Sequence, residues 1–181
     1  QNSKLDIISN RAFEKSSIII IEIPKSVSEI GFRAFYQCKN IKTVYFEDNS
    51  EQEISSQTFE GSSLEKITIP ITVTKIDYRV FYNCLKLPIV DIDLNSNLQI
   101  NAEKAFGNSS IETITFPSGV TGICTKAFLS FFNWNCKKLN DISFIGHSEM
   151  KTISSRAFQN SSIESITVPE MVEIIPKKSF S

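Results

Sequence analysis

Residues 62–81, SSLEKITIPITVTKIDYRVF, hold the pattern that decides the fold, because the rest of the chain repeats it. Six apolar residues lie 3, 2, 4, 3 and 5 positions apart, and a proline directly follows the third of them. A spacing kept to the residue in four copies is an internal repeat, and it predicts a repeat architecture. The four copies are Leu64, Ile67, Ile69, Val73, Ile76 and Phe81; Ile18, Ile21, Ile23, Val27, Ile30 and Phe35; Ile111, Ile114, Phe116, Val120, Ile123 and Phe128; and Ile163, Ile166, Val168, Val172, Ile175 and Phe180.

Alignment on phenylalanine extends the repeat to eight units of two alternating kinds. Successive phenylalanines are 22, 24, 22, 25, 22, 30 and 22 residues apart. Units of the first kind continue with two serines before the next strand, whereas units of the second kind continue with a cysteine and have a longer, more polar return loop. The aligned residues are Phe13, Phe35, Phe59, Phe81, Phe106, Phe128, Phe158 and Phe180.

Local chemistry predicts two extended segments and one turn in each unit. β-Branched residues at alternating positions, as in 67–69, favour a short strand. The proline after it ends the pairing because it lacks an N–H donor, and residues 73–76 are typical of the second segment. The piece that carries the phenylalanine is too short for a full helix, so we expect a single helical or 3₁₀ turn. Gly or Asn two residues later indicates a left-handed residue that closes this turn.

One unit of this size cannot bury its phenylalanine and aliphatic side chains alone, so stacking predicts a solenoid of short parallel strands with few true helices. At a strand spacing of about 4.8 Å, the phenylalanines are expected to form one ladder about 35 Å long. We interpret residues 1–181 as a single solenoid domain of about eight units with incomplete end units. Because solenoid ends normally carry polar caps, we expect either a fragment of a longer protein or an assembly whose neighbours cover the ends.

Composition and charge exclude several classes of function. The chain is 41% hydrophobic, enough for an adequate core. Its 19 basic and 20 acidic residues nearly cancel, which argues against a nucleic-acid binder and against an electrostatic membrane anchor. The longest aliphatic run is residues 18–21, far below the roughly 18 residues of a transmembrane helix. We therefore expect neither nucleic acid nor direct membrane insertion within this segment.

The repeat I-P-x-x-V-x-x-I-x-x-x-x-F, followed by x-x-C in half of the units, resembles the BspA-type (Treponema-type) leucine-rich repeats. The resemblance covers essentially the whole chain and includes the strand motif, the proline, the Ala-Phe pair and the cysteine position. It implies a right-handed, curved leucine-rich-repeat solenoid, a location mostly on bacterial and protist surfaces, and adhesion to host or matrix proteins. The chain departs from the family in rewritten Ser-Val-Thr and Ile-Gly slots, in one insertion and in the lack of a cap.

The sequence is poor in the residue sets that catalysis needs, so we expect no enzyme, no cofactor and no metal site. His147 is the only histidine and stands in the polar segment 145–149, where we expect a solvated loop side chain. One histidine cannot form a His-based zinc cluster. The sequence has no Gly-rich phosphate loop, no nucleophile elbow and no paired-carboxylate motif.

Three of the four cysteines share one repeat position, which serine occupies in other units. A position that accepts only cysteine or serine favours a small residue in a tight buried turn. Equivalent cysteines lie two units apart, about 10 Å by strand spacing, and a disulfide tolerates a Cα separation of up to about 7 Å. We therefore expect buried, unpaired thiols there and a more accessible Cys124. The shared position holds Cys38, Cys84 and Cys136, and Ser16, Ser62, Ser109 and Ser161.

The strand face that points away from the core is the first candidate binding surface. It is rich in threonine and serine and carries one aromatic residue, Tyr45. We select Tyr45, Lys66, Thr68 and Asp91 as candidate binding residues. Such a face suits broad contact with a protein or a glycan, and we expect it to offer no pocket for a small substrate.

An insertion at residues 130–134 (Ser-Phe-Phe-Asn-Trp) is the second candidate. Its Phe131, Phe132 and Trp134 fall outside the repeat frame, and aromatic residues dominate interface hot spots. The alternative is that the loop folds back as a lid over the neighbouring ridge. We expect the insertion to leave every strand in register.

Two asparagines, Asn108 and Asn160, match the N-glycosylation sequon. Their carbohydrate attachment depends on a eukaryotic secretory route. The alternative is that asparagine serves the left-handed turn and the following serine fills the buried slot.

Two hypotheses for the function follow. The first is a non-catalytic binding module, for surface adhesion or for protein or glycan interaction through the strand face and loops, on a cell-surface or secreted protein. The second is a structural element of a larger assembly, with an intracellular location as one option, whose neighbours cover the ends and edges of the solenoid.

Overall fold

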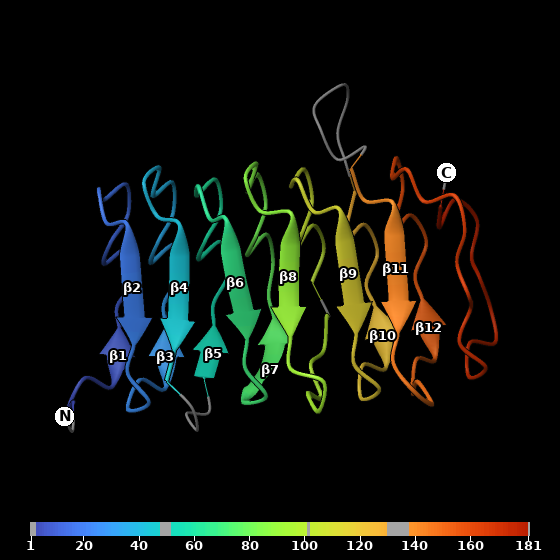
Figure 1. Ribbon diagram of the computed structural model, residues 1–181, viewed down its shortest axis with the longest axis horizontal. Coiled ribbons are helices and arrows are strands. Elements are labelled where there is room, and N and C mark those ends of the chain that lie inside the picture. Colours follow the sequence, from blue (N-terminus) through green and yellow to red (C-terminus); the bar gives the residue numbers. More distant parts are fainter. Residues whose placement is uncertain (1–2, 48–51, 101, 130–137, 181) are drawn as a thin grey trace.

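The chain forms a solenoid of parallel β-strands in the computed structural model, which describes residues 3–47, 52–100, 102–129 and 138–180. Six units each add one strand to a long sheet, and shorter extended segments form a second sheet, with the apolar side chains between them (Figure 1). Every recorded strand pair is parallel. The predicted solenoid of short parallel strands is confirmed, and none of the described residues is helical.

The long sheet has six strands in the order β11-β9-β8-β6-β4-β2. Equivalent repeat positions lie in register across it, for example Ile21 opposite Val44 and Ile67 opposite Val90. The pattern of apolar spacing therefore fixes which residues pair. The strands are β2 (Ile20–Ile23), β4 (Thr43–Phe46), β6 (Lys66–Ile69), β8 (Ile89–Ile92), β9 (Thr113–Phe116) and β11 (Asp141–Phe144).

The second sheet is built from shorter strands after the prolines or return loops. Four of them pair in the order β1-β3-β5-β7, and β10 pairs with β12. Isolated bridges from Lys75 to Gln99 and from Ile100 to Ile123 connect the two groups. The strands are β1 (Ile7–Ile8), β3 (Glu29–Ile30), β5 (Gln52–Ile54), β7 (Val73–Ile76), β10 (Gly122–Ile123) and β12 (Thr152–Ile153).

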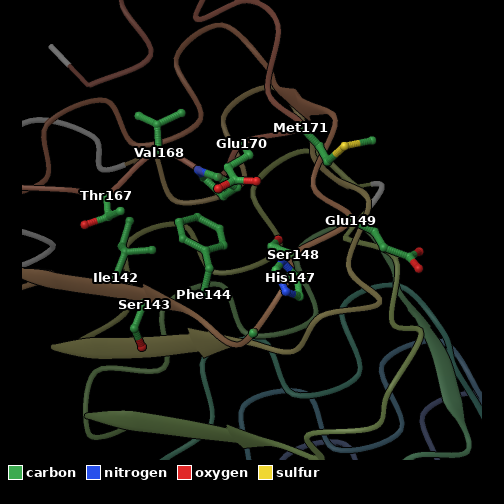
Figure 2. A pocket seen from close by; sticks show the side chains of 12 residues that line it. Ile142, Ser143, Phe144, His147, Ser148, Glu149, Thr167, Val168, Glu170 and Met171 are labelled. Carbon is green, nitrogen blue, oxygen red and sulfur yellow. The ribbon is translucent and has the colours of Figure 1, made fainter.

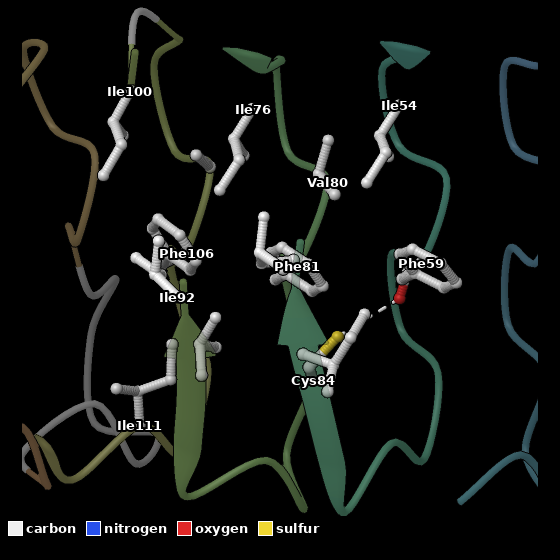
Figure 3. Close-up of a cluster of buried hydrophobic side chains, with 14 of the residues drawn as sticks. Ile54, Phe59, Ile76, Val80, Phe81, Cys84, Ile92, Ile100, Phe106 and Ile111 are labelled. Carbon is white, nitrogen blue, oxygen red and sulfur yellow. Dashed lines mark hydrogen bonds between the residues drawn. The ribbon is translucent and has the colours of Figure 1, made fainter. Parts of the chain in front are cut away.

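A continuous ladder of the eight aligned phenylalanines runs through the core, as predicted. Neighbouring rings are stacked with centroids 4.8–5.7 Å apart and planes within 21° of each other. Figure 3 shows Phe59, Phe81 and Phe106 in neighbouring coils, flanked by Ile54, Ile76 and other aliphatic side chains. The inner rings are buried, whereas those of Phe13 and Phe180 at the two ends are partly buried.

Each turn that carries a phenylalanine contains a left-handed residue on either side of it. The predicted one, two residues after the ring, has φ of 52–67° in every coil where it is described. The other, two residues before the ring, has φ of 55–64° and was not expected, because no glycine or asparagine occupies it. Left-handed residues interrupt helical geometry, so these segments form successive hydrogen-bonded turns and not the predicted helical or 3₁₀ turn.

Hydrogen bonds between coils continue through these turns. The N–H groups of Arg33, Phe35 and Gln37 donate to the carbonyl oxygens of Ser56, Thr58 and Glu60, at 3.3, 2.9 and 2.8 Å. Both left-handed residues thus turn their amides toward the next coil. The buried backbone of the turn is satisfied in the same way as that of a strand.

The last coil departs from the prediction on its strand side. Residues 163–168 repeat the strand motif, but they form no strand. Ile163 and Ile166 are only partly buried, because this coil packs on one neighbour within the described chain, whereas Ile111 and Ile114 lie between two and are 2% exposed. The turn side still docks, since the N–H of Phe158 donates to the carbonyl of Ser179 at 2.8 Å.

The insertion at residues 130–134 lies outside the described residues. The strands on either side of it are paired in register, with Asp141 opposite Thr113 and Thr152 opposite Gly122. The expectation that the insertion leaves these strands in register is confirmed.

The shared cysteine position is buried, and the thiols at Cys38 and Cys84 are free, as predicted. The Cys84 thiol donates to the carbonyl of Phe59 at 3.2 Å and lies 3.5 Å from the Ser62 hydroxyl of the preceding coil. Burial raises the pKa of Cys84 from 9.0 to about 12. Cys124 is half-buried, in line with its expected accessibility. Cys136 lies outside the described residues.

We predict that Phe81→Ala lowers the free energy of unfolding by about 3–5 kcal/mol, because it opens a cavity between two stacked rings. Phe13→Ala is the matched control, since that ring is partly buried at the end of the ladder and should cost clearly less. Equilibrium denaturant unfolding measures both. Equal losses for the two variants would contradict the view that stacking on both faces stabilises each inner ring.

We also predict that iodoacetamide does not modify Cys84 in the native protein at pH 8, because the thiol stays protonated and covered. Since the folded pKa lies above that of the unfolded thiol, its contribution to stability is complete below pH 9 and is lost as the pH rises toward 12. Mass spectrometry after alkylation, with and without denaturant, checks the first part. Cys84→Ser should reduce the loss of stability at alkaline pH, because serine does not ionise in this range. The position accepts serine, since Ser62 occupies it in the preceding coil.

Candidate functional site

The outward face of the long sheet presents side chains that the core does not require. These positions alternate with buried ones along each strand, as in β6, where Lys66 and Thr68 are exposed while Ile67 and Ile69 are buried. Tyr45 is 55% exposed, and Ile20 and Ile89 also face solvent. The face is therefore mildly polar, with isolated apolar side chains.

A hollow of about 420 Å³ opens on this face where β4 and β6 part. The two strands pair only at Thr43–Lys66 and Val44–Ile67, whereas β6 pairs with β8 over three residues. Beyond Val44 the hollow is lined by Tyr45 and Phe46 on one side and by residues from β6 and the following turn on the other. A smaller hollow of about 200 Å³ lies where β8 and β9 part in the same way.

The structure brings four predicted binding residues together around the larger hollow. Tyr45, Lys66 and Thr68 line it, and Asp91 lies opposite Thr68 in the register of β6 and β8. The ammonium of Lys66 lies 3.6 Å from the Asp91 carboxylate, and both side chains are exposed. Such an exposed ion pair contributes little to stability, so both groups are available to a partner. Phe131, Phe132 and Trp134 lie outside the described residues.

The strand face is not smooth, and the expectation that it offers no pocket for a small substrate stays a prediction. The repeat predicts a continuous pleated sheet, but neighbouring strands part at their carboxyl ends and leave hollows between the outward side chains. Sequence reasoning also missed Ile71 and Asp93, which complete the lining of the larger hollow from the segments after β6 and β8. The signal that could have identified them is their position directly after the ends of two neighbouring strands.

A third hollow, of about 910 Å³, lies between β11 and the last coil (Figure 2). It occupies the space left because residues 163–168 do not pair with β11. Its walls mix apolar and polar side chains. Ile142 and Phe144 come from β11 and Val168 and Met171 from the last coil, and Ser143, His147, Glu149, Thr167 and Glu170 also line it.

The titratable side chains around this hollow are one histidine and two glutamates, His147, Glu149 and Glu170. His147 lines it and is exposed, as expected for a loop histidine. Within the described residues, no group of three or more His, Cys, Asp or Glu side chains is placed to hold a metal ion. The nearby Ser148 hydroxyl accepts the N–H of Met150 at 3.3 Å, a hydrogen bond within the loop.

The two candidate glycosylation sites differ in their surroundings. The Asn108 side-chain amide donates to the Asn83 side-chain oxygen of the preceding coil. Asn160 is exposed. Both residues have positive φ, as the turn interpretation requires. Attachment of carbohydrate at either position stays a prediction.

Across the part of the chain that the structure describes, no helix has the length and apolar character to span a membrane.

Sequence comparison finds one matching family. The model of the BspA type leucine-rich repeat region matches residues 6–133 and 52–181, with 6 copies of the repeat. These ranges together cover nearly the whole chain. Among curated proteins, no sequence matches this chain.

Structure comparison finds leucine-rich-repeat proteins. The crystal structure of the pneumococcal vaccine antigen PcpA is 23% identical with a TM-score of 0.56, covering 94% of this chain and 50% of that one. A leucine-rich repeat protein from Bacteroides ovatus is 20% identical with the same TM-score, covering 85% of this chain and 52% of that one. The chain thus spans about half the length of these structures, and the likeness shows the fold.

Proposed function

Because this chain belongs to the BspA-type leucine-rich-repeat family, we propose that it is a non-catalytic module that binds a protein or a glycan through its strand face. The observation that carries the proposal is the hollow between β4 and β6, where Tyr45, Lys66 and Thr68 line one concave surface. A surface adhesion role, on a cell-surface or secreted protein, is part of the same proposal.

The alternation of buried and outward positions along each strand supports this function. Buried positions must hold Ile, Val or Phe to keep the coils stacked, so they cannot vary with the partner. Outward positions carry no such requirement, and on β4, β6 and β8 they place an aromatic ring, an ammonium and a carboxylate within three neighbouring strands. Tyrosine is one of the residue types enriched at the hot spots of interfaces.

Binding of the folded chain to a panel of purified extracellular-matrix proteins and glycans tests the proposal. We predict that Tyr45→Ala and Lys66→Ala each weaken the interaction with a bound partner, at least one of them by about 1 kcal/mol or more. Neither change should move the melting temperature, because both side chains are exposed.

Lys75→Ala provides the matched control, since Lys75 is an exposed lysine on β7 of the second sheet. Its affinity should equal that of the wild type. If the folded chain binds none of the proteins or glycans, the adhesion proposal fails, and a structural role within a larger assembly becomes the better interpretation.

A further inference from the structure

A column of basic side chains follows the phenylalanine ladder from one end of the solenoid to the other. It occupies the unexpected left-handed position two residues before each ring, and seven of its eight members are arginine or lysine. Since the rings repeat every 4.8–5.7 Å, the column carries about one cation per coil at that spacing. Its members are Arg11, Arg33, Gln57, Arg79, Lys104, Lys126, Arg156 and Lys178.

The chain separates its charges although its net charge is only −1. The turn face is defined here as the residues from four before to two after each ladder phenylalanine. By sequence it holds nine of the 19 basic residues and four of the 20 acidic ones, so it carries a net charge of +5 and the rest of the chain −6. The four acidic residues are Glu14, Glu60, Asp77 and Glu103.

Several of these cations form ion pairs with carboxylates of the turn face, which hold their side chains in place. Arg79 contacts Glu60 at 2.7 Å, and the Glu60 side chain is 7% exposed. Glu103 receives Lys126 at 3.0 Å and Lys104 at 3.7 Å, and hydrogen bonding from Lys126 lowers the pKa of Glu103. One carboxylate thus pairs with two cations, so the net charge of this group of three side chains is positive.

Arg33 is held in place without a carboxylate. Its guanidinium carbon lies 5.0 Å from the ring centre of Phe32 and 4.6 Å from that of Tyr36. In the described chain no carboxylate lies within ion-pair distance of it. Stacking on two rings therefore orders a cation whose charge is not neutralised.

A groove of about 350 Å³ runs beside this column. It is lined by residues two positions after the rings in four successive coils, Gln37, Gly61, Asn83 and Asn108, together with Tyr36, Lys39, Glu60 and Leu85. The groove and the column are in contact, because Arg33 stacks on Tyr36 and Arg79 pairs with Glu60, which also lines the groove. Side-chain amides and a phenol are groups that donate to and accept from hydroxyls.

We infer that the turn face binds a linear acidic polysaccharide, which lies along the solenoid axis with its hydroxyls in the amide-lined groove and its sulfate or carboxylate groups on the basic column. Guanidinium forks pair with such oxyanions through two parallel hydrogen bonds. This site is separate from the strand-face hollow and does not depend on the function proposed for it.

The geometry favours a polysaccharide over other polyanions. Duplex DNA carries one charge per roughly 1.7 Å of axis, far denser than one cation per coil. Single-stranded nucleic acid needs free aromatic faces for base stacking, whereas Arg33 and Arg79 lie over Tyr36 and Tyr82. An anionic membrane is flat and cannot enter the groove.

Heparin oligosaccharides are the probe, with binding measured by calorimetry over a series of salt concentrations. We predict that wild-type chain binds and that Arg33→Gln, Lys104→Gln and Lys126→Gln together raise the dissociation constant roughly tenfold or more, because three ion contacts are lost together. The salt dependence of binding should weaken in parallel. Gln57 already occupies this position with φ 59°, so the backbone accepts the substitution.

A second variant tests the groove. Gly61→Gln places in it a side chain that the equivalent Gln37 shows to be compatible with this φ. A Cβ at Gly61 meets only the flexible Gln37 and Lys39 side chains, at 3.3 and 3.8 Å. This variant should also lose heparin binding, while the folded state, checked by circular dichroism, is kept.

The matched control removes the same charge elsewhere, with Lys25→Gln, Lys75→Gln and Lys151→Gln, all exposed lysines outside the turn face. It and Tyr45→Ala should bind heparin like the wild type. The inference is overturned if wild type does not bind heparin at physiological salt, or if the control loses as much as the turn-face variant. It is equally overturned if Gly61→Gln binds normally, or if duplex DNA or phosphatidylserine vesicles bind as tightly as heparin.

Discussion

Stacking of each phenylalanine on the next is the interaction on which the rest of the structure depends. Parallel strands lie about 4.7–4.9 Å apart, and the ring centroids of the ladder are 4.8–5.7 Å apart. The two distances are close, so one coil-to-coil step satisfies the backbone hydrogen bonds and the aromatic contact at the same time. Any insertion that shifted the register of a coil would break both. This explains why the connecting loops vary in length, so that successive ladder phenylalanines lie 22 to 30 residues apart in sequence, while the rings stay stacked at one coil-to-coil step.

The same step decides which positions are free for function. A side chain that points into the coil is held by its equivalents above and below, as Cys84 is by Ser62. A side chain that points outward is not packed between its equivalents in the neighbouring coils, so its identity is free to vary. The slot two residues before the ring combines both conditions. Its left-handed backbone disfavours β-branched residues, while its outward direction admits long unbranched ones, and arginine, lysine and glutamine meet both demands.

Much of the fold could be predicted because it depends on spacing. The strands β2 to β11, the ladder and the buried thiols follow from one apolar pattern, and the candidate residues Tyr45, Lys66, Thr68 and Asp91 meet because register aligns them. The prediction of a strand at 163–168 was wrong, because the apolar spacing does not indicate how many coils pack against a given coil. The hollows between strands depend on where pairing stops, which no repeat position encodes. The second left-handed residue could not be predicted, because neither glycine nor asparagine occupies its position. The basic residues at this position are nevertheless recognisable in the sequence once the phenylalanines are aligned.

A solenoid changes what a nearly neutral composition means. In an ordinary domain, residues close in space come from unrelated parts of the sequence, so 19 basic and 20 acidic residues are expected to mix over the surface. Here, one choice of residue type at one repeat position becomes a line of equal charges along the whole axis. Net charge therefore excludes a densely charged partner such as duplex DNA, but it does not exclude a polymer that meets one column only. The relevant quantity is the charge of each column, and the turn face at +5 and the remainder at −6 differ far more than their sum indicates.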